Sequence, residues 1–118
     1  MDRQIVNPAD TAAVEKLISS TPRLCLCLWT SDSFDISGPE DVDDVLIRIL
    51  EPYGSKVVGA KFDLTDNEKL AERFLTGGLV NPEVLLFENG EEIARYDHVW
   101  DLDELRQFPR SYWNPILI

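Results

Sequence analysis

The chain has 118 residues, a 44% share of apolar residues and a formal net charge of -11, from 22 acidic and 11 basic side chains. This length fits one domain, residues 1–118, that can bury its own core without added cross-links. The excess of acid argues against nucleic acid and against an anionic membrane as partners, because both require a basic face and the basic residues are scattered singly.

The N-terminal residues 1–4 lack the basic flank and apolar run of a signal peptide, and the longest apolar run, Leu24–Trp29, is too short to span a bilayer. The two cysteines, Cys25 and Cys27, alternate along a predicted strand, a spacing that separates their side chains too far for a disulfide. Thiols without a pairing partner suit a reducing compartment, so we expect a cytoplasmic protein.

The first two predicted elements are a helix and a central strand. Asn7 followed by Pro8 has the pattern of a helix cap and first helical residue, and the helix runs to residues 19–20. The segment Arg23–Trp29 then has no polar alternation after its first residue. A strand of this kind is covered on both faces, so we expect it at the centre of a sheet.

A second helix and a second strand follow. Ser37 and Glu40 have capping-box spacing, and apolar residues then recur at helical intervals up to Leu50, until Pro52 and Gly54 end the helix. Residues 56–63 alternate as a strand does.

The C-terminal half repeats these signals. Residues 65–68 form a second capping box, which opens a helix that ends at residues 76–78. Two strands joined by an Asn89-Gly90 turn come next, and residues 101–104 form a third capping box. The last helix is expected to bury Leu105 and Phe108 and to end before Pro109. The predicted order is αβαβαββα, an α/β fold with a mixed sheet.

This order resembles that of thioredoxins from about residue 5 to residue 108. Trp29 stands like the family's Trp at the end of the central strand, Asp63 like the acid that closes the next strand, Pro82 like the cis-proline that faces the active site, and Asn89-Gly90 like the hairpin turn. The resemblance implies a three-layer α/β/α sandwich with a mixed central sheet.

The active-site motif of that family is absent. Counted from Trp29, the two catalytic cysteines fall at Ser33 and Ile36, and Cys27 takes the place of the buried acid beneath the site. A thioredoxin attacks disulfides with a low-pKa thiolate and releases the product through a second thiol. The Ser33 hydroxyl has no adjacent base, so the resemblance implies a member without redox catalysis.

The two cysteines present have two readings. Cysteine is among the most buried residue types, and Cys25 and Cys27 within an apolar strand are first of all core residues. The alternative is a redox pair at the end of the sheet. Together with His98, the single histidine, they do not complete a zinc site, and the spacing of Asp32 and Asp35 misses that of a calcium loop, so we expect no metal and no cofactor.

A peptide groove is expected where the thioredoxin site would lie. Aromatic side chains supply binding energy at interfaces, and acidic side chains near this groove favour a basic partner, although part of this acid stabilises a helix N-terminus. The predicted partner-binding residues are Trp29, Asp32, Asp35, Pro82, His98 and Trp100.

We therefore expect a non-catalytic thioredoxin-fold protein-binding module, such as an assembly chaperone or adaptor, that binds a basic or extended peptide. His98 followed by Trp100 before the last helix is similar to thioredoxin-like chaperones of hydrogenase maturation, which also lack the cysteine pair. One alternative is an atypical thiol-disulfide oxidoreductase that uses Cys27 with Cys25 or with a partner's thiol. Another is a structural subunit or homodimer that docks through the tail, residues 109–118. This tail is unusually apolar for a chain end, and it either docks in this way or folds back over the sheet as core.

Overall fold

The structure, a computed structural model, describes residues 5–29, 40–64, 83–97 and 101–114. Its centre is a four-stranded mixed sheet in the order β2-β1-β3-β4. The edge strand β2 pairs parallel with β1, and β3 pairs antiparallel with both β1 and β4. The strands are β1 (Arg23–Trp29), β2 (Val58–Asp63), β3 (Glu83–Glu88) and β4 (Glu91–Tyr96).

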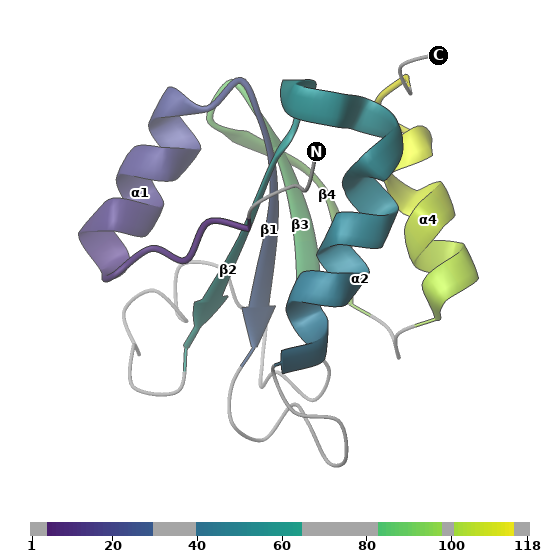
Figure 1. Ribbon diagram of the computed structural model, residues 1–118. Coiled ribbons are helices and arrows are strands. Elements are labelled where there is room, and N and C mark those ends of the chain that lie inside the picture. Colours follow the sequence, from purple (N-terminus) through teal and green to yellow (C-terminus); the bar gives the residue numbers. More distant parts are fainter. Residues whose placement is uncertain (1–4, 30–39, 65–82, 98–100, 115–118) are drawn as a thin grey trace.

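Helices cover both faces of this sheet. One face carries α1 (Thr11–Ser20), and the other carries α2 (Glu40–Leu50) and α4 (Leu102–Arg110) (Figure 1). A 3-10 helix, η2 (Glu51–Lys56), follows α2 directly. The arrangement confirms the predicted three-layer α/β/α sandwich with a mixed sheet. The helix predicted to begin at residues 65–68 lies outside the described residues.

The apolar residues form one cluster on each face of the sheet. Alternate residues of β1 divide between them: Cys25, Cys27 and Trp29 pack with α2 and α4, whereas Leu24, Leu26 and Leu28 pack with α1. Every residue of β1 after Arg23 is buried. The prediction of a central strand covered on both faces is therefore confirmed.

The predicted start of the first helix is wrong. The N-cap is Asp10, whose carboxylate accepts a hydrogen bond from the Ala13 N–H at 2.8 Å, and not Asn7. The segment before it is held at the edge of the sheet, because the Val6 N–H donates to Gly59 O and the Val6 carbonyl accepts from the Lys61 N–H. Asp10 itself has the extended backbone of an N-cap residue, with φ of -154° and ψ of -179°, so the helix begins at Thr11.

The predicted end of the last helix is also wrong, because α4 continues through Pro109 to Arg110. Proline within a helix removes one hydrogen bond to the preceding turn. Here the loss falls in the last turn, where the N–H groups of Tyr112 and Trp113 donate to the Pro109 carbonyl and close the helix end. Trp113 is 2% exposed and belongs to the core, so this part of the apolar tail packs against the fold.

The hairpin was predicted correctly. Asn89 and Gly90 have φ values of 52° and 87°, the pair of positive φ values that a two-residue hairpin turn requires. Only glycine, and with less ease asparagine, adopts this backbone without strain. The Asn89 N–H also donates to the Pro22 carbonyl at 2.8 Å, which ties the turn to the start of β1.

Candidate functional site

The predicted site lies where β1 and β2 end side by side. Trp29 and Asp63 are opposite one another in the parallel register, and the Leu64 N–H donates to the Trp29 carbonyl at 2.7 Å. The Trp29 side chain is only 6% exposed and belongs to the cluster under α2. Asp63 is exposed. Trp29 therefore stands at the expected place, with most of its ring in the core.

Five of the six predicted partner-binding residues cannot be placed. Asp32, Asp35, Pro82, His98 and Trp100 lie outside the described residues, as do Ser33 and Ile36, the positions that correspond to catalytic cysteines. The groove that these residues were predicted to form stays a prediction.

The two thiols lie beneath this end of the sheet. Cys25 and Cys27 both point to the face that α2 and α4 cover, both are 0% exposed, and neither is in a disulfide. The expectation that they do not form a disulfide is confirmed. Burial raises the pKa of the Cys27 thiol well above its ordinary value, and the neighbouring Cys25 raises it further. At neutral pH this thiol is therefore protonated and a poor nucleophile.

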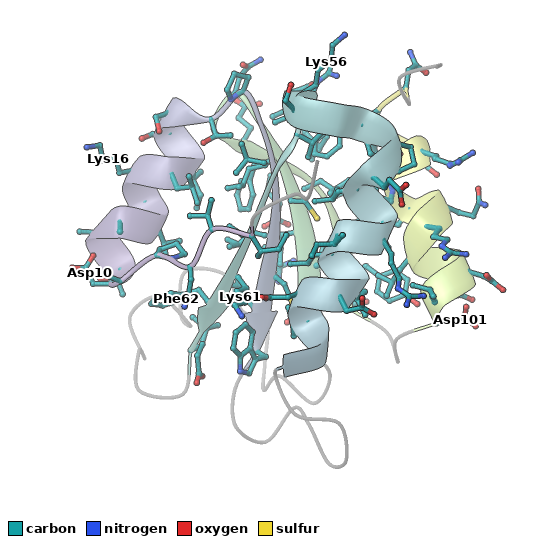
Figure 2. All side chains as sticks on the ribbon, in the orientation of Figure 1. Asp10, Lys16, Lys56, Lys61, Phe62 and Asp101 are labelled. Atoms are coloured by element: carbon teal, nitrogen blue, oxygen red, sulfur yellow. The ribbon has the colours of Figure 1, made fainter. Side chains whose placement is uncertain are left out.

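Lys61 is a functional candidate that the sequence analysis missed. It lies on β2 directly opposite Cys27, on the face that α2 covers, and Figure 2 shows its side chain between β2 and α2. Its ammonium group lies 2.6 Å from a carboxylate oxygen of Asp43 on α2, and its side chain is only 19% exposed. The positive charge lowers the pKa of Cys27, against the larger effect of burial.

One sequence signal could have revealed this lysine. In β2, Phe62 packs toward α1 and residues two apart share a face, so the alternation places Lys61 on the face of Gly59, toward α2. A single lysine on a half-buried strand position requires a partner. The partner, Asp43, is one of several acidic residues at the start of α2, and the sequence alone does not indicate which of them pairs with Lys61.

What this arrangement can do chemically is limited. Within the described residues, no group of three or more histidine, cysteine, aspartate or glutamate side chains is placed to hold a metal ion. None of the helices in the described segments is long and apolar enough to cross a membrane. A buried neutral thiol beside a lysine that already pairs with a carboxylate offers neither an accessible nucleophile nor a free base.

Comparisons with known proteins give the fold. No protein-family model and no curated protein matches the chain. Among solved structures, a mutant thioredoxin of Halobacterium salinarum is 21% identical with a TM-score of 0.70, and covers 98% of this chain and 94% of its own. The Plasmodium falciparum thioredoxin is 15% identical with a TM-score of 0.72, over 92% of this chain and 100% of its own. A Malassezia sympodialis thioredoxin is 17% identical with a TM-score of 0.72, and covers 95% of this chain and 94% of its own. At these identities the likeness concerns the backbone, and with the sheet order and the helical layers it shows that this chain has a thioredoxin-like fold.

Proposed function

We propose that the chain is a non-catalytic thioredoxin-fold module that binds a basic or extended peptide of another protein, as an assembly chaperone or adaptor does. One observation carries the proposal: both thiols are 0% exposed and sit within the core. Thiol-disulfide exchange requires an accessible thiolate of low pKa, and burial raises the pKa of Cys27 instead. A thioredoxin-like fold whose cysteines are inaccessible is suited to binding another protein and not to thiol-disulfide exchange.

The proposed binding residues are those expected from the sequence: Trp29, Asp32, Asp35, Pro82, His98 and Trp100. In this proposal the carboxylates of Asp32 and Asp35 attract a basic segment, and the Trp100 ring contacts its side chains, while Trp29 supports this surface from the core, where most of its ring is buried. Attraction between exposed charges is screened by salt, so binding should weaken as ionic strength rises. Two cysteines that do not form a disulfide suit a reducing compartment, and we propose the cytoplasm.

The first test is a quantitative pull-down from native extract. The bait is either the wild-type chain or a variant that carries Asp32→Asn, Asp35→Asn and Trp100→Ala. A matched control carries Glu51→Gln and Glu91→Gln, which removes the same two charges from exposed positions elsewhere. Proteins retained by the wild type and the control but lost by the triple variant would support the proposal. Equal retention by all three baits would reject this binding site.

An atypical thiol-disulfide oxidoreductase is the second candidate, and the position of Lys61 favours it. A lysine opposite Cys27 favours the thiolate form, as cations do beside reactive cysteines. The test is alkylation of the native protein by iodoacetamide, together with an insulin-reduction assay. Rapid alkylation that disappears in Cys27→Ser, with turnover of insulin, would establish this candidate over the binding module. Thiols that react only after denaturation would exclude it.

A further inference from the structure

A hollow lies between the edge strand β4 and the outer side of α4. Its volume is about 540 Å³, and its walls include Arg95 and Tyr96 from β4 and Asp103, Glu104, Phe108 and Tyr112 from α4 and the turn after it. Among the described residues, β4 pairs only with β3, so this side of the sheet has no further strand. None of the six residues of the proposed groove is among the residues that line this hollow.

Three aromatic rings line this hollow in series. The Tyr96 and Phe108 ring centroids are 5.7 Å apart, and those of Phe108 and Tyr112 are 5.8 Å apart. Tyr96 is 5% exposed, whereas Tyr112 is 50% exposed and is one of only two large apolar or aromatic side chains exposed among the described residues. The series therefore begins with a buried ring, Tyr96, and ends with a half-exposed ring, Tyr112, that a partner can contact.

Carboxylates accompany these rings. One Glu104 carboxylate oxygen accepts a hydrogen bond from the Tyr96 hydroxyl at 2.8 Å, which fixes the carboxylate beside the aromatic series. Asp103 lies next to it on the wall of the hollow.

Among the described residues of the wall, the only basic side chain is Arg95, and it already pairs with carboxylates on the sheet. The Arg95 guanidinium donates to Glu83 at 3.2 Å and to Glu92 at 2.8 Å. The other two arginines of this region, Arg106 and Arg110, do not line the hollow. The surface of the hollow is therefore aromatic and negative, with two carboxylates that no basic wall residue balances.

We propose that this hollow is a second docking surface, which binds an arginine-bearing segment of a partner protein. One guanidinium of this segment stacks on the exposed Tyr112 ring, and another pairs with Glu104 or Asp103. Cation–π attraction and ion pairing then act along the same segment, and arginine suits both better than lysine because its planar guanidinium stacks on rings and binds carboxylates through two N–H groups. This goes beyond the proposed function, because it concerns another edge of the sheet and does not require the groove at Trp29.

The test uses a short fluorescein-labelled peptide in which arginine alternates with serine, and measures its affinity by fluorescence anisotropy at low ionic strength. We expect Tyr112→Ala and Glu104→Gln each to weaken binding by about two- to fivefold, the usual size of exposed cation–π and ion-pair contributions. Tyr112→Phe, which keeps the ring, should bind as the wild type does. Glu15→Gln, which removes the same charge from α1 on the opposite face, should also leave affinity unchanged.

Changes in the amide chemical shifts of the isotopically labelled protein, on addition of the same peptide, locate its binding site. Shifts centred on Tyr96, Glu104 and Tyr112 would support the proposal, and shifts confined to Trp29 and Leu64 would overturn it while supporting the proposed function. Equal loss of affinity in Glu15→Gln and Glu104→Gln would mean attraction by net charge alone, and would also overturn it. Binding that appears only when residues 115–118 are removed would also overturn the proposal, since the occupant would then be the chain's own end. Self-association that Tyr112→Ala abolishes would overturn it as well, since the occupant would then be a second copy.

Discussion

The burial of the Cys27 thiol makes the stability of the fold depend on pH. Its side chain is 0% exposed, and burial holds its pKa well above the ordinary value, so the folded protein keeps the thiol protonated under conditions where the unfolded chain loses the proton. A group with a raised folded pKa stabilises the fold fully below its unfolded pKa, and this stabilisation is lost as pH rises toward the folded pKa.

We therefore expect the free energy of unfolding to fall as the pH rises through the unfolded thiol pKa of about 8.5 and on to about pH 9.5. The slope attributable to Cys27 should approach about 1.4 kcal/mol per pH unit at the upper end. Urea unfolding at several pH values measures it, with Cys27→Ala as the control. Identical slopes in the two proteins would show that the thiol ionises as easily in the folded state as in the unfolded chain.

Lys61 and Asp43 join the sheet to α2 through one ion pair, with 2.6 Å between the charged atoms. The Asp43 side chain is 47% exposed, so solvent screens much of the attraction. A double-mutant cycle with Asp43→Asn and Lys61→Met should give a coupling of about 0.5 kcal/mol that shrinks in high salt. A coupling of zero would mean that Lys61 is held by packing of its stem alone.

At the scale of elements, the sequence signals that succeeded are local. The uninterrupted apolar run of β1, the Asn89-Gly90 turn and the cap of α4 at Asp101 depend on neighbours along the chain, and each appears at its predicted place. Asp101 accepts hydrogen bonds from the N–H groups of Asp103 and Glu104, as a capping residue does.

The error at Pro109 is local, because the following residues close the helix end there, but two other features depend on contacts distant in sequence. Val6 is extended because it pairs with β2, more than fifty residues away. Likewise, the opposition of Lys61 and Cys27 follows from the strand register, which no local pattern of residues contains. Of the residues predicted for the candidate site, the structure describes Trp29 at its expected place, and the other five stay predictions. The hollow between β4 and α4 could not be predicted, since it combines a strand edge with one side of a helix.

Gly59 sets the distance between α2 and β2. A Cβ atom at this position would lie 2.8 Å from the Leu50 Cδ1 atom and 3.0 Å from the Ile5 Cδ1 atom. We expect Gly59→Ala to destabilise the protein by about 1 kcal/mol, because two side-chain ends have to move within a packed core. Urea unfolding tests this. Gly90→Ala serves as a comparison in which strain comes from the backbone φ of 87° and not from crowding. Unchanged stability of Gly59→Ala would mean that Leu50 moves aside freely.

At the scale of the whole molecule, the net charge of -11 works against the compact state. The described ion pairs, such as those of Arg95 with Glu83 and Glu92, recover only part of this repulsion. Sodium chloride screens the repulsion between exposed charges. We expect the thermal midpoint to rise by about 3–5 °C between low and physiological ionic strength, which corresponds to about 1 kcal/mol.

Differential scanning calorimetry measures this rise, and sodium chloride replaced by an equal osmolality of sucrose separates screening from excluded-volume effects. A midpoint that falls on addition of salt would mean that the ion pairs contribute more than the repulsion costs.

The position of β1 has a consequence for the motions of the molecule. It has a hydrogen-bonded strand at each edge and a packed cluster on each face, so no local opening can bring its central peptide groups to water. Hydrogen exchange of the amides between Cys25 and Cys27 must then proceed by unfolding of the entire domain. The exchange rate of these few amides is therefore a gauge of the global stability, against which the looser surroundings of any binding surface can be compared.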